Sequence, residues 1–419
     1  MRVLAARYLL PVSQPAIRDG ALLIDGARIR SVGPRAVLKE EHPGAAWWDL
    51  GEAILLPGLV NVHTHLELCA LRQQVPSGRS FVDWIVNLVE QKRSLLGETC
   101  AGAVAEGIAE LIRSGTTCVG DVASTGVSLP ALKNSGLRGV VYREMIGLDD
   151  ARAEEIAEVS LAHLKAMREE ARGSLLEVGI SPHATYSLSP RLFHLCRQAQ
   201  QGLDLKAAIH AAESGPEVEY LRSGGGEIRT RLLPATGWGD VPPPTLGTTP
   251  VRYLDGLNLL RPKCLLVHAV HLTEGDLDIV AQRGVAVAHC PRSNAFLGVG
   301  RAPLKALRDL RVPVGLGTDS LASNESLSLW DEIRFAHQVH GGLLSPAEWI
   351  RMVTAGGAEA LGLDREIGTL EPGKRADLTA VSLDGSEADP YEYLLHDAGP
   401  EKVLLTLVEG TSLYERRES

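Results

Sequence analysis

The sequence lacks the cysteine pattern of a disulfide-bonded or structural-zinc protein. Its six cysteines are scattered, and no two of them form a C-x-x-C pair. This spacing argues against a disulfide framework and against a structural zinc site, and it favours a reducing, cytoplasmic location. The cysteines are Cys69, Cys100, Cys118, Cys196, Cys264 and Cys290.

Long apolar runs and clusters of basic residues are also missing. No segment approaches the roughly 20 apolar residues of a membrane helix. Pro11 interrupts the short apolar run near the N-terminus that resembles a signal peptide. No Lys/Arg cluster offers a surface for nucleic acid or for a membrane, and the net charge is −10. We therefore expect neither nucleic acid nor a membrane as a partner.

Several catalytic signatures are absent as well. No G-x-S-x-G, P-loop or dinucleotide fingerprint occurs in a suitable context. The H-x-E with P-C-x-x-C signature of the cytidine-type zinc deaminases is missing. The segment LEVGI, residues 176–180, has no lysine that carbamylation would turn into a bridge between two metals, so one ion is the simpler expectation.

What the sequence does contain is a regular alternation of apolar and helical segments. Its 419 residues exceed the roughly 250 of a (β/α)8 barrel, which leaves room for a smaller domain. Eight apolar segments, each separated by enough residues for a helix, predict an α/β fold with a closed parallel barrel. The predicted strands are 54–62, 116–122, 139–145, 176–183, 203–210, 264–270, 285–290 and 312–319.

Both ends of the chain read instead as short strands broken by turns. We expect residues 1–57 and 366–419 to form one composite β-sandwich domain, and residues 58–365 to form the barrel. The long segment 214–256, rich in Gly and Pro, predicts an irregular loop over the C-terminal rim of the barrel. A lid that shapes specificity and an inert surface excursion are equally open interpretations of it.

Histidines and an aspartate fall at the ends of predicted strands. His63 and His65 form an H-x-H pair after an apolar strand, where alternate side chains point to the same side. His210 and Asp319 complete a set of three nitrogens and one oxygen with an open position for water. The set predicts one divalent ion that activates water, with zinc as first candidate and iron or manganese as alternatives. A helix-capping role is the alternative for Asp319.

Two further residues are candidates for catalysis. Glu213, three residues after His210, is placed to carry a proton from water to a leaving group, and a solvated loop carboxylate is the alternative. His268 is the expected partner of the hydroxide or of the tetrahedral intermediate. A buried histidine bonded to a backbone carbonyl is its alternative.

Together these motifs resemble the amidohydrolase superfamily, in its branch of cytosine, guanine and adenosine-derivative deaminases and triazine chlorohydrolases. The resemblance implies a barrel joined to a β-sandwich, metal ligation by His63, His65, His210 and Asp319, proton transfer by Glu213, and assistance from His268. A homodimer is common in such relatives. The matching segments run through nearly the whole chain in the family's order: LPGLVNVHTHLE, SPHATYSLSP, HAAE, VHAVHLTEGD, AHCPRSNAFLGVG, LGTDSLASNESLSL and IGTLEPGKRADLTAV.

The resemblance also implies which residues bind the substrate. In the branch that deaminates adenosine-like thioethers, the corresponding positions are His183 against the nucleoside and Arg143 in the wall of the site. Glu90 corresponds to a residue that binds the ribose hydroxyls, with the alignment open by about one helical turn. Trp84 and Ser320 complete the expected substrate-binding set.

A finer resemblance concerns the segment 214–256. Its EYLRSGGG and the TTPVRYLDGLNLL that follows are similar to a subgroup associated with aminodeoxyfutalosine deamination in menaquinone synthesis. That substrate is an adenine nucleoside bearing a carboxyphenyl ketone, so we expect a cation for its carboxylate. Arg229, Arg231 and Arg252 are the candidates.

The sequence thus predicts a metal-dependent hydrolase that removes an exocyclic amino group from an adenine-type nucleoside, with aminodeoxyfutalosine as first candidate. Departing ammonia needs a proton donor and departing chloride does not, so Glu213 favours deamination over dechlorination. The alternatives are a methylthioadenosine/S-adenosylhomocysteine, guanine or cytosine deaminase, a triazine chlorohydrolase and a cyclic-amide hydrolase. A non-catalytic barrel that acts as a binding protein is disfavoured by the complete ligand set.

Overall fold

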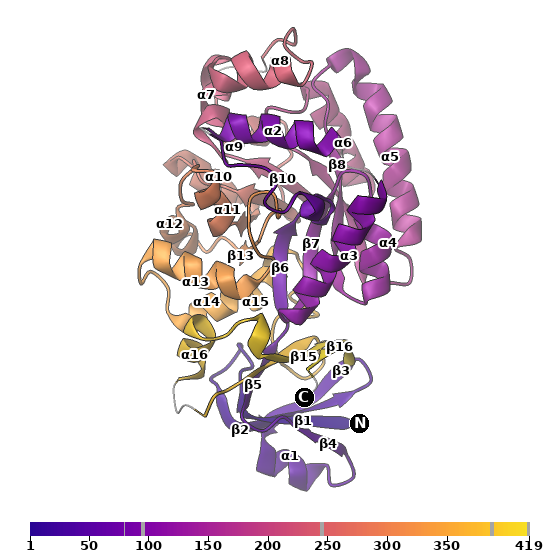
Figure 1. Cartoon of the computed structure of the whole chain (residues 1–419), viewed down its shortest axis with the longest axis vertical. Helices are drawn as coiled ribbons and strands as arrows, with labels where there is room; N and C mark the ends of the chain where they lie inside the picture. The colour runs from indigo at the N-terminus through magenta and orange to yellow at the C-terminus, as the bar shows by residue number, and fades with distance from the viewer. Residues whose placement is uncertain (79, 94–96, 244–246, 386–388, 417–419) are drawn as a thin grey trace.

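The computed structural model describes residues 1–419 apart from 79, 94–96, 244–246, 386–388 and 417–419. The strands named in it form two eight-stranded sheets. One sheet is built from both ends of the chain and lies at the lower end of Figure 1, where the two termini are close together. The other lies in the larger upper part of the molecule and is surrounded by helices.

The second sheet is the predicted barrel. Its strands pair in parallel and in sequence order, and an isolated bridge between Thr64 and Asp319 links the last strand back to the first. The (β/α)8 prediction is therefore confirmed. The strands are β6 (Leu59–Thr64), β7 (Thr116–Ala123), β8 (Arg138–Met145), β9 (Leu176–Pro182), β10 (Ala207–Ala211), β11 (Cys264–His268), β12 (Ala286–His289) and β13 (Val314–Leu316).

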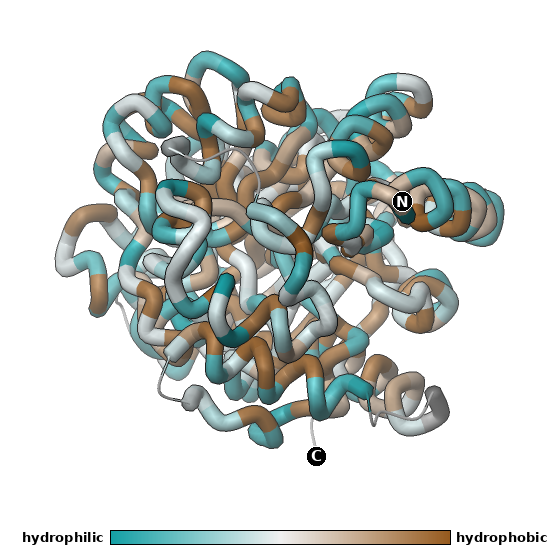
Figure 2. Tube along the Cα trace, turned by 90° about the horizontal axis from the view of Figure 1, so that it is seen from above, coloured by the Kyte–Doolittle hydropathy of each residue, from teal (hydrophilic) through white to brown (hydrophobic). Residues whose placement is uncertain are grey.

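The helices pack around these strands, which are largely buried because a parallel barrel is covered on its outer face and filled on its inner face. Ser189 caps α6 by accepting a hydrogen bond from the Leu192 backbone, as the Ser-Pro sequence there predicts. Hydrophobic and hydrophilic stretches alternate along the peripheral segments in Figure 2, the pattern of helices with one packed side. The elements between the barrel strands and just after them are η1 (Leu66–Leu71), α2 (Phe81–Arg93), α3 (Gly97–Arg113), α4 (Ser128–Ser135), η2 (Asp150–Arg152), α5 (Ala153–Glu170), α6 (Pro190–Gly202), α10 (Glu274–Arg283), α11 (Pro291–Phe296), α12 (Leu304–Asp309), α13 (Leu329–His340), α14 (Pro346–Met352) and α15 (Ala355–Ala360).

The terminal sheet interleaves strands from the two chain ends, which confirms that both termini build one β unit. β14 from the C-terminal part pairs with β5 from the N-terminal part, and the order is β16-β15-β14-β5-β1-β2-β3 with β4 on β1. The exact domain boundaries stay a prediction. The elements are β1 (Arg2–Leu9), β2 (Ile17–Asp25), β3 (Arg28–Pro34), α1 (Arg35–Glu41), β4 (Ala46–Asp49), β5 (Ala53–Pro57), β14 (Leu378–Ser382), α16 (Pro390–His396), η4 (Pro400–Lys402), β15 (Val403–Val408) and β16 (Thr411–Glu415).

One predicted strand is in fact two. The segment 54–62 divides at Gly58: β5 belongs to the terminal sheet, and β6 is the first barrel strand. The Gly58 backbone N–H donates to the carbonyl of Asp377 at 3.1 Å. A Cβ on Gly58 would lie 2.1 Å from the Thr117 hydroxyl oxygen, so only glycine fits this crossing between the sheets.

The segment 214–256 is largely helical, so the prediction of an irregular loop is wrong. It contains α7 (Gly215–Ser223), the π-helix η3 (Ile228–Leu232), α8 (Leu233–Ala235) and α9 (Pro250–Gly256). In Figure 1, α7 and α8 lie at the end of the molecule opposite the terminal sheet. There η3 contacts α2. The two segments together cover the C-terminal end of the barrel.

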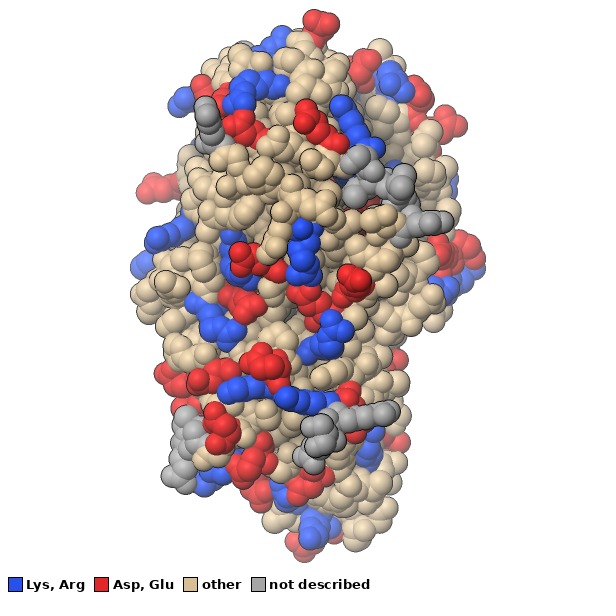
Figure 3. All heavy atoms as spheres, in the orientation of Figure 1, with Lys and Arg blue, Asp and Glu red and all other residues tan. Residues whose placement is uncertain are grey.

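On the face drawn in Figure 3, acidic and basic side chains are interspersed. Within the described part of the chain, no helix combines the length and the apolar character needed to cross a membrane. All six cysteines are free and buried.

Candidate active site

The four predicted metal ligands meet at the C-terminal end of the barrel. The Nε2 atoms of His63 and His65 lie 3.5 and 3.6 Å from Oδ1 of Asp319. Nε2 of His210 lies 3.3 Å from Nε2 of His65. His268 joins the same group, because its ligand atom lies within 4.8 Å of those of His63 and His210. Five side chains from the ends of four barrel strands, β6, β10, β11 and β13, therefore converge on one point.

Hydrogen bonds fix two of these imidazoles with a lone pair toward the centre. Nδ1 of His210 lies 3.0 Å from the carbonyl oxygen of His183, and Nδ1 of His268 lies 2.9 Å from Oδ1 of Asn294. These oxygens only accept hydrogen bonds, so each Nδ1 carries the proton and each Nε2 is left unprotonated. Metal-binding histidines are oriented in this way by partners outside the ligand set.

The protonation states in the cluster are those that metal ligands need. Burial and the neighbouring imidazoles lower the pKa of His65 to about 3 and that of His210 well below its usual value. Burial alone would raise the pKa of Asp319. The opposing effect of the imidazoles of His63, His268 and His65 is larger, so the pKa of Asp319 lies well below the ordinary range. His65 and His210 are thus neutral and Asp319 is ionised at neutral pH.

The donor set fits a divalent ion. Nε2 of His63 is buried and has no hydrogen-bond partner among the described residues, because the approach of Asp319 at 3.5 Å lacks hydrogen-bond geometry. An ion at the centre of the cluster would satisfy this atom and the lone pair of His210. Imidazole nitrogens with one carboxylate suit zinc, iron or manganese.

Backbone strain is concentrated in the same place. Ala212, His268 and Asp319 adopt positive φ angles of 53°, 71° and 58°. Residues other than glycine rarely occupy this left-handed region, and such strain gathers at functional sites. These strained residues lie at the ends of β10 and β11 and just after β13. Their backbone conformation directs Glu213, His268 and Asp319 toward the cluster.

Glu213 stands beside the cluster, as predicted. Its Oε1 lies 3.4 Å from Nε2 of His268, and its backbone N–H donates to Oε2 of Glu217 at 2.8 Å. Thr185 donates to the other oxygen of Glu217 at 2.5 Å, which ties this turn to the loop after β9. Burial, together with the charges of Asp319 and Glu217, raises the pKa of Glu213 well above its usual value. Such a carboxyl group is suited to exchanging protons.

The cluster opens into a cavity with two connected chambers. The inner chamber, of about 140 Å³, is lined by the metal-site residues and by an apolar wall that includes Phe81, Trp84 and Leu88. The outer chamber, of about 370 Å³, lies between α2 and the segment Leu232–Trp238. The two chambers share a set of wall residues: Ile85, Val89, Lys92, Ile146, His183 and Tyr186.

Three of the five expected substrate-binding residues line this cavity. His183 faces both chambers, and its Nδ1 lies 2.8 Å from the Ser187 hydroxyl. Trp84 and Ser320 line the inner chamber, and the Trp84 indole donates to the carbonyl of Ala322 at 3.3 Å. These positions agree with the expectation, although contact with a substrate stays a prediction.

The other two expected residues lie elsewhere. Glu90 is exposed on α2 and lines neither chamber. Arg143 also lines neither chamber: its guanidinium donates to the carbonyls of Ala123 and Ser124. Side chains alternate along β8, and Val140 and Tyr142 fill the barrel interior while Val141 and Met145 pack outside. Arg143 shares the outward direction, whereas Glu144 points inward and lines the inner chamber.

The arginines expected to meet a substrate carboxylate are engaged elsewhere too. Arg231 pairs with Asp83 and Glu227, and Arg229 donates to the carbonyl of Val241 at 2.5 Å. Arg252 lies 4.0 Å from Asp276. None of the three lines the chambers, where the cationic wall residues are Lys92 and Arg93 from α2. The sequence analysis did not predict either residue. The helical spacing of four residues was a usable signal for Lys92, because it places Trp84, Leu88 and Lys92 on one side of α2.

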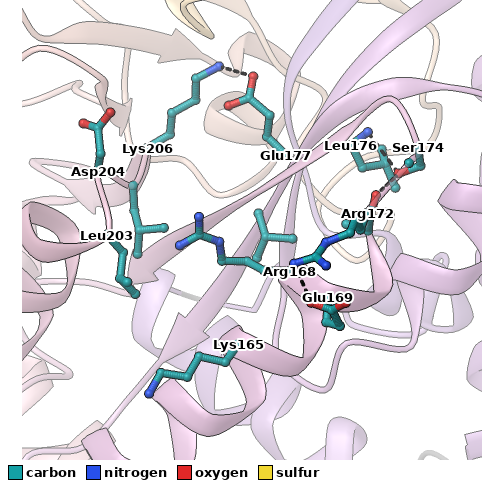
Figure 4. Close-up of a pocket in the computed structure, with 14 residues that line it drawn as sticks. Lys165, Arg168, Glu169, Arg172, Ser174, Leu176, Glu177, Leu203, Asp204 and Lys206 are labelled. Atoms are coloured by element: carbon teal, nitrogen blue, oxygen red, sulfur yellow. Dashed lines mark hydrogen bonds and ion pairs between the residues drawn. The ribbon is translucent and has the colours of Figure 1, made fainter.

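A larger cavity of about 530 Å³ lies at the other end of the strands (Figure 4). It surrounds the beginnings of β9 and β10, whereas His183 and His210 lie at the ends of these strands. Lys206 pairs with Glu177 at 3.0 Å and Arg172 with Glu169 at 2.8 Å. Catalytic residues of (β/α)8 barrels lie at the C-terminal rim, so this cavity is not the candidate active site.

Fold and site together define a (β/α)8 hydrolase-type barrel with a candidate mononuclear metal centre at its C-terminal rim. Residues 54–413 match the Amidohydrolase family, and residues 20–45 match the imidazolonepropionase-like composite domain of bacteria. The chain belongs to the amidohydrolase family. It is a hydrolase that acts on C–N bonds.

Relatives of known activity match over most of the chain. It is 33% identical to a 5-methylthioadenosine/S-adenosylhomocysteine deaminase of Nitratidesulfovibrio vulgaris, over 96% of this chain and 88% of the relative. It is 35% identical to the aminodeoxyfutalosine deaminase of Deinococcus radiodurans, over 86% of each protein.

Solved structures share the fold. A zinc-bound adenosine deaminase from Xanthomonas campestris superposes with a TM-score of 0.83 at 28% identity, over 98% of this chain and 92% of the other. The Helicobacter pylori aminofutalosine deaminase in complex with methylthio-coformycin gives a TM-score of 0.87 at 23% identity, over 98% of this chain and 100% of the other.

Proposed function

We propose that the protein is a metal-dependent hydrolytic deaminase that converts the exocyclic amino group of an adenine-type nucleoside into a carbonyl and releases ammonia. The observation that carries this proposal is the placement of Glu213 beside the cluster of His63, His65, His210 and Asp319, at the floor of the inner chamber. The zinc-bound relative supports zinc as the ion. A bound divalent ion would lower the pKa of a water molecule and so supply a nucleophile near neutral pH.

The surrounding residues provide the proton transfers. Glu213 takes a proton from the attacking water and delivers it to the departing amino group, and its raised pKa suits both transfers. His268 presents its unprotonated Nε2 toward the same point, where it accepts a hydrogen bond from the nucleophile. The apolar wall of Phe81, Trp84 and Leu88 excludes bulk water and faces the plane of the ring.

The outer chamber supports a substrate with a bulky substituent on the sugar. Its wall is mostly apolar, with Leu232, Leu233 and Trp238 on one side, and Arg93 adds a positive charge. An aromatic carboxylate matches this combination, so aminodeoxyfutalosine is the first candidate, and a role in menaquinone synthesis follows from it. The deaminase of Deinococcus radiodurans supports this choice. Methylthioadenosine and S-adenosylhomocysteine are the second candidates, favoured by relatives that cover 96% of the chain.

Ammonia release from a panel of amines tests the proposal. The metal-replete enzyme is given aminodeoxyfutalosine, methylthioadenosine, S-adenosylhomocysteine, adenosine, guanine and cytosine, and each reaction is followed by its ultraviolet change. We expect rapid turnover of one adenine nucleoside, with the preferred substituent naming the substrate. Turnover of guanine or cytosine alone would refute the proposal and favour a nucleobase deaminase. Turnover of no compound in the panel would also refute it and would favour a chloride or cyclic-amide substrate. Cytoplasmic location and homodimer formation stay predictions.

A further inference from the structure

Glu144 is a buried carboxylate in the wall of the inner chamber that the catalytic steps above do not use. It is 7% exposed and projects from β8 toward the barrel interior. The same wall combines apolar side chains, among them Ile85, Leu88 and Ile146, with the polar Lys92 and His183. A carboxylate in such surroundings costs free energy unless it is paired or accepts hydrogen bonds.

The structure holds one oxygen of Glu144 and leaves the other open. Oε2 accepts a hydrogen bond from the Ser124 hydroxyl and lies 3.8 Å from Nζ of Lys92. Lys92 also donates to the Ser124 hydroxyl at 2.7 Å. Within the described part of the chain, no hydrogen bond reaches Oε1. Because Glu144 lines the inner chamber and its Oε2 is held by Ser124, Oε1 is the oxygen available to face the cavity.

The loop that carries Ser124 is itself held firmly. The buried carboxylate of Glu67 accepts hydrogen bonds from the backbone N–H groups of Ser124, Thr125, Gly126 and Val127, at 2.7–3.0 Å. Burial alone would raise the pKa of Glu144. The opposing effect of Lys92 and the nearby histidines is larger and lowers the pKa to about 2. Glu144 is thus a fixed, ionised acceptor aimed into the chamber.

We propose that Glu144 binds the vicinal hydroxyls of the substrate's sugar through Oε1. This inference rests on the proposed function. The carbon that carries the exocyclic amine of an adenine nucleoside reacts at the metal centre. The vicinal hydroxyls are therefore the hydrogen-bond donors that remain on the nucleoside. Lys92 and His183 line both chambers, so a sugar bound beside them directs its substituent into the outer chamber. Glu144 therefore takes the role that the family resemblance assigns to Glu90.

The test compares 5′-methylthioadenosine with its 2′,3′-dideoxy analogue. In the wild-type enzyme, kcat/KM for the analogue should be lower by about 10- to 100-fold, the range for hydrogen bonds to a charged group. E144A should lose about the same factor on methylthioadenosine and almost nothing further on the analogue. E177Q, at the opposite end of the barrel, is the matched control and should keep the wild-type ratio. The Tm and the zinc content of each variant establish that the fold and the metal centre are retained.

Three outcomes would overturn the inference. The first is a wild-type enzyme that processes both nucleosides equally well, and the second is a loss of the same factor on both by E144A. The third is a loss of the discrimination in E90Q and not in E144A. In each of these cases the wild-type enzyme still deaminates methylthioadenosine. A failure of the proposed function is distinct, because the wild-type enzyme would then release ammonia from no adenine nucleoside.

Discussion

Glu213 and His268 lie 3.4 Å apart at the floor of the inner chamber, and in the proposed mechanism Glu213 delivers the proton to the departing amine. Replacing it by glutamine keeps the size and polarity of the side chain but removes the exchangeable proton. We expect E213Q to bind one zinc ion per chain and to lose at least about 10²-fold in kcat, the scale of general acid–base catalysis. Metal analysis and steady-state kinetics check this, and a variant with near-wild-type kcat would remove Glu213 from the mechanism.

The residues that sequence reasoning located are those whose chemistry is tied to a strand end. His63, His65, His210 and Asp319 follow apolar strands directly, and the barrel geometry brings such positions together. Glu144 was missed because an acidic residue on a strand has no motif around it. Strand alternation contains the missing signal, since Tyr142 and Glu144 share one side of β8 and Arg143 takes the other.

At the scale of an element, the turn after β10 determines where Glu213 points. Glu217, in the first turn of α7, accepts the backbone N–H of Glu213 and the hydroxyl of Thr185. We expect E217A to lower kcat by about 10- to 100-fold, because it leaves buried donors unpaired and releases the turn. The kinetic double-mutant cycle is the decisive readout: E217A should add little to the loss already caused by E213Q. Fully additive losses would show that Glu217 acts independently of Glu213.

The sequence analysis predicted a loop for the segment 214–256 because of its glycine and proline residues, and some of these residues mark the ends of helices. Ser214 and Thr249 cap α7 and α9, and a proline follows each within the first turn. Gly224 ends α7 in a left-handed conformation. Counted only as composition, these glycines and prolines indicate a loop, whereas by position they are helix boundaries.

Trp238 belongs to the same segment and gives the outer chamber part of its apolar wall. Truncation to alanine removes contact area that only a bulky sugar substituent reaches. We expect W238A to lower kcat/KM for the preferred bulky nucleoside by about 10-fold and to leave adenosine almost unaffected. Equal losses on both substrates would mean that the outer chamber does not hold the substituent.

At the scale of the whole molecule, buried carboxyl groups make stability depend on pH. Burial raises the pKa of Glu332 on α13 from 4.5 to about 8, against the lowering effects of its contacts with Asn324 and Arg292. This group is protonated in the fold and ionised in the unfolded chain between these values. The stability that it contributes is therefore complete below about pH 4.5 and is lost as the pH rises through about 8.

The variant E332Q cannot titrate at this position, so it isolates the effect. We expect the Tm of the wild-type protein to fall relative to that of E332Q between pH 6 and pH 8, and the difference to level off at higher pH. Calorimetry of both proteins across this range checks the sign. A wild-type Tm that rises relative to the variant would contradict the assignment of a raised pKa.

The molecule's architecture follows from the sequence more securely than its substrate does. Alternating apolar and helical segments predict the barrel, and strand patterns at both termini predict the joint β unit. The identity of the substrate depends on the outer chamber, which lies between α2 and the segment Leu232–Trp238. These two parts are far apart in the chain: Asp83 of α2 pairs with Arg231, which follows it by 148 residues. No local pattern specifies such a contact, so the shape of the outer chamber came only with the structure.

The central claim is that one bound ion per chain makes this barrel a nucleoside deaminase. Its most direct test is to add zinc in steps to chelator-treated protein and to measure ammonia released from the preferred adenine nucleoside. We predict no release without metal and a linear rise that stops at one zinc per chain. Undiminished release from the metal-free protein, or a rise that continues to two zinc ions per chain, would contradict it.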